Sequence, residues 1–164
     1  MSDNAVLFLV FVVIFILYLW IKEWQSKPQY MTIPLFTPAE KNFMWVLDRA
    51  LGGEYMVLGK VRIADVLRSQ HGIDPKKAKR QFWQTSSKHL DFVIADKKTL
   101  DPVCVIELND GSHERKDRKQ RDIFVDEACR SAELPILWVK AERYYDEDKV
   151  RAVILNKIRE GREC

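Results

Sequence analysis

The chain has 164 residues, of which 47% are hydrophobic and 31% charged, and its formal net charge at pH 7 is +3. This length suits one domain with an appendage, and the sequence shows neither repeats nor low-complexity tracts. The mild positive charge permits a nucleic-acid partner without requiring one. Cys104, Cys129 and Cys164 lie far apart without metal-ligand spacing, which argues against a zinc site and fits a reducing compartment.

The appendage is an uncharged apolar segment at residues 5–21, which is long enough to cross a bilayer as a helix. Aromatic residues that suit a membrane interface lie at its C-terminal end, namely Tyr18, Trp20 and Trp24. A cleaved signal peptide would need a basic start, but this chain starts with an acid, Asp3, and no Lys or Arg. We therefore expect residues 1–22 to form an uncleaved membrane anchor.

The flanks of this segment predict its orientation. Lys22 and Lys27 follow the apolar segment and no basic side chain precedes it, so the positive-inside rule places the C-terminal part in the cytoplasm. The protein is then expected in the inner (cytoplasmic) membrane. Residues 23–36 carry two prolines and few apolar positions in register, which is typical of a tether, and residues 37–164 form the predicted domain.

The first half of the domain contains a helix, a strand and a second helix. Thr37 begins a capping-box sequence with proline and Glu40, and the apolar side chains of Phe43, Leu47 and Leu51 follow at four-residue spacing. The predicted strand covers residues 55–63. A helix opened by Asp74-Pro75 should run to about Phe82.

The second half begins with two apolar strands, at residues 90–95 and 102–108, joined by a short polar turn typical of a hairpin. A charged helix should follow at about 115–132, then a strand at 134–140 and a helix starting at Asp146. We expect apolar faces toward the core in both helices, made by Ile123, Phe124, Ala128 and Cys129 and by Val150, Val153, Ile154 and Ile158. A hairpin followed by a helical crossover gives an α/β domain with a mixed sheet flanked by helices.

Each strand of the hairpin carries one acidic residue within an otherwise apolar run. Asp91 lies near the start of the first strand and Glu107 near the end of the second, so pairing of the strands brings them together. A buried carboxylate must be paired or bind a cation. Two such carboxylates beside phosphate-binding cations are what a divalent-metal phosphodiesterase needs. The alternatives are an Asp91 that faces water and a salt bridge between Glu107 and a nearby Lys or Arg.

Two groups of basic residues flank the acids. The first group is Lys76, Lys77, Lys79 and Arg80, and the second is Arg115, Lys116, Arg118, Lys119 and Arg121. A charged helix face is often merely solvated. Two basic groups on either side of a carboxylate pair nevertheless favour a polyanionic partner.

Several segments together resemble the bacterial family called domain of unknown function 2726, which is related to the very-short-patch-repair endonucleases of the PD-(D/E)XK nuclease superfamily. The resemblance covers roughly residues 37–141. Its matching pieces are TPAEKNFMWVLDRAL (residues 37–51), HLDFVIAD (89–96), VIELNDGSHERKDRKQRD (105–122) and AELPILWV (132–139). In that superfamily an Asp on one strand is followed by an acid-x-Lys on the next, whereas this chain has Asn109 where the lysine would stand.

The resemblance implies a restriction-endonuclease-like fold and a site for Mg²⁺ or Mn²⁺. Asp91 and Glu107 would be metal ligands, and Glu40 matches an acid of the first helix, although capping explains it equally well. Asn109 and His113 would complete the catalytic set, with His113 as a general acid/base or phosphate contact. Asn109 cannot supply positive charge to a transition state, so a displaced cation would have to do so, from among Lys88, Lys116 and Lys119.

Three side chains near this site have structural explanations as well. Asp110 suits a turn, and Arg121 with Asp122 suits an internal ion pair that holds the charged helix to the sheet. The expected function is Mg²⁺-dependent phosphodiester hydrolysis of DNA by a membrane-anchored cytoplasmic protein. The alternatives are a catalytically inactive nucleic-acid-binding module and a membrane-bound regulatory or assembly module with the same fold.

Overall fold

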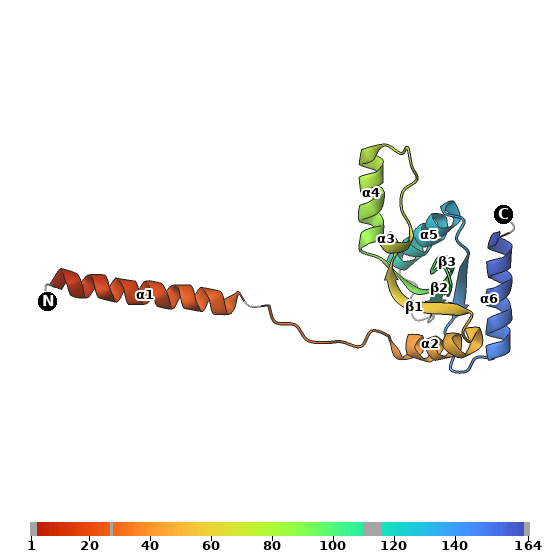
Figure 1. Ribbon diagram of the computed structural model, residues 1–164, viewed down its shortest axis with the longest axis horizontal. Coiled ribbons are helices and arrows are strands. Elements are labelled where there is room, and N and C mark those ends of the chain that lie inside the picture. The colour runs from red at the N-terminus through yellow and green to blue at the C-terminus, as the bar shows by residue number, and fades with distance from the viewer. Residues whose placement is uncertain (1–2, 27, 110–115, 163–164) are drawn as a thin grey trace. The chain divides into compact units, whose positions relative to one another are not determined.

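The computed structural model of the protein describes residues 3–26, 28–109 and 116–162. The chain divides into two units, Met1–Pro34 and Leu35–Cys164. The first unit contains helix α1 (Asp3–Gln25), none of whose side chains is buried (Figure 1). Within the described part of the chain, α1 is the helix that is long and apolar enough to cross a membrane. The predicted apolar helix is therefore present, whereas its insertion in a membrane stays a prediction.

The second unit is built on a four-stranded mixed sheet. Its strands are β1 (Tyr55–Arg62), β2 (His89–Asp96), β3 (Pro102–Asn109) and β4 (Ile136–Lys140), and they lie in the order β1-β2-β3-β4. The β1–β2 and β2–β3 pairs are antiparallel, and β3 and β4 are parallel because α5 (Lys116–Ser131) connects them. The prediction of an α/β domain with a mixed sheet and flanking helices is confirmed.

Helices α2 (Pro38–Leu51) and α6 (Glu147–Arg162) pack on one face of the sheet (Figure 1). The predicted capping box at Thr37 is present, with both of its hydrogen bonds, and it fixes the start of α2. Phe43, Leu47 and Leu51 are buried, as their spacing predicts, in the same core cluster as Phe92 of β2. This core cluster holds the N-terminal turn of α2 beside the ends of β1 and β2.

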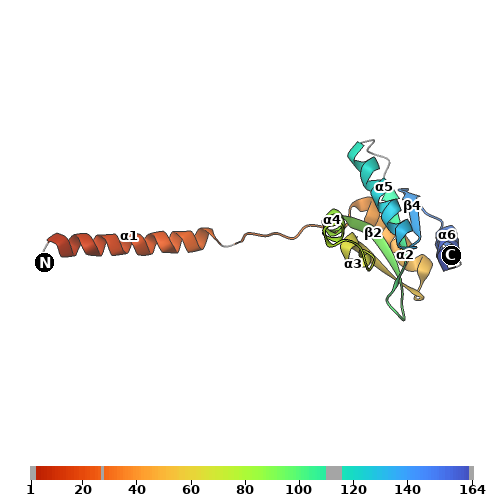
Figure 2. The ribbon, with the colours of Figure 1, turned by 90° about the horizontal axis from the view of Figure 1, so that it is seen from above.

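Helix α5 covers the opposite face of the sheet, together with the short helix α3 (Ile63–Val66) (Figure 2). The sequence did not predict α3, and the expected strand end at Ile63 is its first residue instead. In α5 the expectation that Ile123 faces the core is wrong, because Val125 and Cys129, four residues apart, form the buried stripe. Ile123 lies two positions before Val125 and therefore points to solvent.

The remaining helix boundaries depend on caps and turns. Helix α4 (Pro75–Ser86) begins where Asp74 caps it and runs one turn beyond the predicted end, with none of its side chains buried. Strand β4 begins two residues later than expected because the Leu134 N–H bonds back to the Cys129 carbonyl at 3.0 Å and so closes α5. In α6, Ile154 and Ile158 are buried, but Val153 is exposed, which corrects the expected face.

Candidate functional site

Two acids from different elements bond to one lysine at the end of the sheet where β2 begins. Lys60, in β1, places its Nζ 2.7 Å from Oε1 of Glu40 and 2.9 Å from Oδ1 of Asp91. Glu40 is in the first turn of α2, where its other oxygen accepts the Thr37 N–H at 2.9 Å. Asp91 is the third residue of β2. The ammonium of Lys60 therefore bridges the helix and the sheet.

The backbone around Lys60 is unusual. Its φ of 55° lies in the left-handed region, which a non-glycine residue rarely adopts within a strand. The neighbouring Gly59 lies under the ring of Phe36, since a Cβ added there would meet the Phe36 Cζ at 2.2 Å. The Phe36 ring in turn stacks on Phe92 with 5.8 Å between centroids. Packing thus holds Lys60 in a strained conformation, which is a frequent property of functional positions.

Glu107, near the end of β3, completes the group of acids from the other side of Asp91. It is only 2% exposed, and its Oε2 accepts a hydrogen bond from Nη2 of Arg121 at 3.0 Å. Arg121 reaches it from α5 and also donates to the backbone carbonyl of His89 at 2.9 Å. The two acids are tied through the main chain, because Asp91 N–H points to Glu107 Oε1 at 3.4 Å and Leu108 N–H donates to Asp91 Oδ2 at 3.1 Å.

The acids differ in their electrostatics. Burial, reinforced by the charge of Asp91, raises the pKa of Glu107 to about 7, although Arg121 opposes this rise. For Glu40 partial burial acts upward, but hydrogen bonds from Lys60 and the Thr37 backbone outweigh it and lower its pKa. The pKa of Lys60 is raised, because its bonds to Glu40 and Asp91 outweigh the effect of its burial. At neutral pH the site therefore holds a charged Lys60 bonded to Glu40 and Asp91, and on the other side of Asp91 a Glu107 carboxyl that ionises with difficulty.

The structure brings together the predicted acids Glu40, Asp91 and Glu107. Asn109 is the exposed last residue of β3, and its backbone carbonyl accepts the Ala141 N–H at 2.7 Å. His113 and Asp110 lie outside the described residues, as does the side chain of Lys116. The acids were therefore predictable from the sequence, whereas the source of positive charge was not.

Lys60 is a cation of the site that was not predicted from the sequence. Of the predicted lysines, Lys88 bonds the Gln84 carbonyl at 2.6 Å and lies 5.1 Å from the Phe124 ring centroid, and Lys119 is exposed on α5. The available signal was a lysine within the apolar strand YMVLGKVR. In the antiparallel register, Gly59 pairs with Phe92 and Val61 with Leu90, which sets Lys60 opposite Asp91.

Among the residues that the structure describes, each acid of the site is paired with a lysine or an arginine. Arg121 also contacts Asp122 at 3.3 Å, but both residues lie on α5, so the ion pair that joins this helix to the sheet is the one between Arg121 and Glu107. Among these described residues, no group of three or more His, Cys, Asp or Glu side chains is arranged to hold a metal ion.

The fold and the site define an α/β protein with an apolar N-terminal helix and a cluster of ion-paired acids at one edge of a mixed sheet. The family described as "Protein of unknown function (DUF2726)" matches residues 32–158. The chain belongs to this family. No curated protein and no solved structure matches this chain.

Proposed function

We propose that this protein is a membrane-anchored phosphodiesterase that acts on DNA with the help of a divalent metal ion. The observation that carries the proposal is Lys60 between Glu40 and Asp91. A lysine next to paired acids supplies the positive charge that Asn109 cannot give. The resemblance to the PD-(D/E)XK superfamily, whose pattern lacks only its lysine here, supports the same activity.

The donor chemistry of the site fits Mg²⁺ or Mn²⁺. Both ions prefer carboxylate oxygens, and Glu40, Asp91 and Glu107 are the residues that would hold the ion. Burial and the charge of Asp91 raise the pKa of Glu107, so additional positive charge there would be favourable. When bound, the metal would activate water and neutralise phosphate charge. Lys60 now occupies the space between two of these acids, so we expect it to move when a metal binds.

The side chains of the protein have separate roles in this proposal. Lys60 would turn from Asp91 to a non-bridging phosphate oxygen and stabilise the negative charge that develops there. Arg121 would keep Glu107 in place, because it joins that carboxylate to the His89 carbonyl. Thr37 would fix Glu40 through the capping box. Lys60 is thus the proposed catalytic residue, and Arg121 and Thr37 are positioning residues.

The second candidate function is a catalytically inactive nucleic-acid-binding module. Its support is the set of ion pairs, since Lys60 and Arg121 already neutralise the acids that a metal would need. Its affinity would depend steeply on salt, because cations of the protein displace counterions from phosphates. The third alternative, a regulatory or assembly module at the membrane, requires neither metal nor nucleic acid.

A cleavage assay on the full chain in detergent micelles separates these functions. With Mn²⁺ or Mg²⁺, we expect the chain to cut DNA and the variants Asp91→Asn, Glu107→Gln and Lys60→Gln to lose at least about a hundred-fold in rate. Asp101→Asn, in the hairpin turn at the other end of β2, is the matched control and should retain activity. Binding without cleavage in every form would establish the binding module, and absence of both would leave the regulatory role.

The membrane anchor is a separate part of the proposal. Helix α1 supports it by its length and apolar composition, and Lys22 and Lys27 support a cytoplasmic position for the domain. A reporter that is active only in the cytoplasm should be active when it is fused after Cys164. A reporter signal from the periplasm, or a mature protein without residues 1–20, would contradict the anchor.

A further inference from the structure

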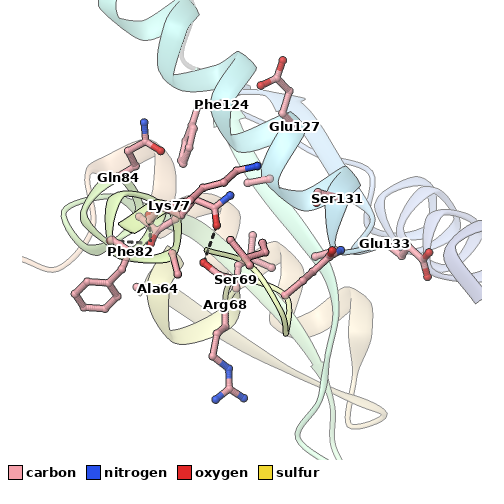
Figure 3. A pocket seen from close by; sticks show the side chains of 18 residues that line it. Ala64, Arg68, Ser69, Lys77, Phe82, Gln84, Phe124, Glu127, Ser131 and Glu133 are labelled. Atoms are coloured by element: carbon pink, nitrogen blue, oxygen red, sulfur yellow. Dashed lines mark hydrogen bonds between the residues drawn. The ribbon is translucent and has the colours of Figure 1, made fainter. Parts of the chain in front are cut away.

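Helix α4 projects from the domain without a partner for most of its surface (Figure 1). None of its side chains is buried, and Trp83 remains 64% exposed. A cavity of about 1050 Å³ lies between α4, the segment before it and α5, as Figure 3 shows. Phe124 and Glu127 of α5 line one wall of this cavity, and a hydrogen bond of 2.7 Å joins Ser69 to Gln81 on the other. The helix is therefore joined to the domain on the side that faces the cavity and accessible over most of its surface.

One stripe of α4 combines positive charge with an aromatic ring. A shallow hollow of about 560 Å³ is lined by Lys76, Lys79, Arg80, Trp83, Gln84 and Lys88. The first five of these recur at the three- and four-residue spacing of one helix face. The helix contains no acid, and its cations form no ion pair with any acid that the structure describes. The stripe therefore presents uncompensated positive charge around an exposed indole.

The stripe leads to the group of acids. Lys88 is three residues before Asp91, and its ammonium lies over the ring of Phe124. Phe124 is one helical turn after Arg121, which binds Glu107. Lys88 thus places one cation of the stripe directly before β2 and one α5 turn from Arg121.

We propose that this stripe of α4 binds an unpaired strand of nucleic acid, with phosphates on its cations and a base stacked on Trp83. An exposed aromatic face within a basic groove is how proteins hold single strands irrespective of sequence, whereas a duplex keeps its bases stacked on one another. A helix that lies on a membrane would carry its cations and aromatic rings on opposite faces. Here Trp83 lies among the cations. The inference rests on the proposed function for its substrate class and specifies the form of nucleic acid.

The test is binding of a fluorescein-labelled 20-nucleotide oligo(dT) to the full chain in nonionic micelles, followed by anisotropy. We expect Trp83→Ala to weaken binding by about 5- to 150-fold, because stacking on one aromatic ring is lost. Trp83→Phe should retain most of the affinity. Trp45→Ala is the matched control, since Trp45 is 55% exposed on α2, away from the stripe, and its loss should leave the affinity unchanged.

Salt dependence tests the cations of the same stripe. The double substitution Lys79→Ala with Arg80→Ala should reduce the slope of log K against log salt by about 1.4, as expected for two contacts with a single strand. The control is Lys97→Ala with Lys98→Ala in the hairpin turn, which removes the same charge at the other end of β2 and should leave the slope unchanged. Equal slopes for the two double variants, or equal affinities for the variants at Trp83 and Trp45, would overturn the inference.

Tryptic cleavage at residues 76–80 distinguishes the partners. Protection by oligo(dT) supports the inference, whereas protection by anionic nanodiscs alone, with no effect of oligo(dT), would assign α4 to the lipid surface and overturn it. The proposed hydrolysis can fail separately. If Trp83→Ala loses binding and neither the wild type nor any variant cleaves DNA, the α4 site stands and the nuclease proposal fails. If cleavage depends on metal and on Asp91 while Trp83→Ala binds as the wild type does, the nuclease proposal stands and the α4 site fails.

Discussion

Replacing Lys60 by Gln should destabilise the metal-free protein and at the same time strengthen its binding of Mn²⁺. In the native site the lysine ammonium bonds both Glu40 and Asp91. Without it the two carboxylates face each other with no cation between them, so the fold loses two favourable bonds and gains a repulsion. A divalent ion no longer has to displace the lysine, so its dissociation constant should fall.

The size of the loss follows from the geometry. The side chains of Lys60, Glu40 and Asp91 are 26%, 13% and 15% exposed, so their pairs lie between surface and buried salt bridges in strength. Hydrogen bonds to charged groups contribute a net stabilisation of about 1.5–3 kcal/mol each, and the partial exposure of these side chains reduces that value. We expect the free energy of unfolding to fall by about 2–4 kcal/mol. At about 4 °C per kcal/mol for a domain of this size, the melting temperature should fall by about 8–16 °C.

The assay is thermal unfolding of the full chain with and without Mn²⁺. An ion at a hundred times its dissociation constant stabilises the folded state by about 2.7 kcal/mol, so the variant should recover most of its loss. Wild-type protein should gain less at the same concentration because Lys60 competes with the ion. Lys98→Gln, at an exposed turn position, is the control and should melt as the wild type does in both conditions.

Two results would refute this reasoning. Melting of Lys60→Gln at the wild-type temperature would mean that the bridge between Glu40 and Asp91 contributes nothing to stability. A destabilised variant that Mn²⁺ does not rescue would mean that the acids form a structural ion-pair cluster. The second result would favour the inactive binding module over the phosphodiesterase.

Three further predictions concern the core, the buried acid and the strained strand. Leu47→Ala should lower the free energy of unfolding by about 2–5 kcal/mol and Lys41→Ala by little, and equal losses in urea melts would show that the helix phase is wrong. The raised pKa of Glu107 means that the folded state binds its proton more tightly. As the pH rises from 4.5 to about 7, the free energy of unfolding of the wild type should therefore fall relative to that of Glu107→Gln, by on the order of 3 kcal/mol. A difference between the two proteins that does not change with pH would contradict this. Gly59→Ala should cost about 1–3 kcal/mol, because its Cβ meets the Phe36 ring, and Phe36→Ala should reduce that added cost in a double-mutant cycle of thermal melts.

The sequence predicted the elements of this fold where local patterns determine them. The capping box at Thr37, the four-residue spacing of Phe43 and Leu47, and the polar turn between two apolar strands each involve neighbouring residues. The predicted order of elements and the mixed sheet followed from these patterns. The faces of α5 and α6 were less determined, because several overlapping apolar stripes fit one charged helix and tertiary contacts select among them.

The acids of the candidate site could be recognised from the sequence because a charge inside an apolar strand must have a partner. Asp91 and Glu107 were identified in this way, and their pairing followed from the hairpin. The partners themselves were decided only by tertiary structure. Lys60 precedes Asp91 by 31 residues and meets it through strand register, and Glu40 joins them because α2 packs beside the end of β1. Such long-range contacts depend on register and packing, which residue patterns along the chain do not encode locally.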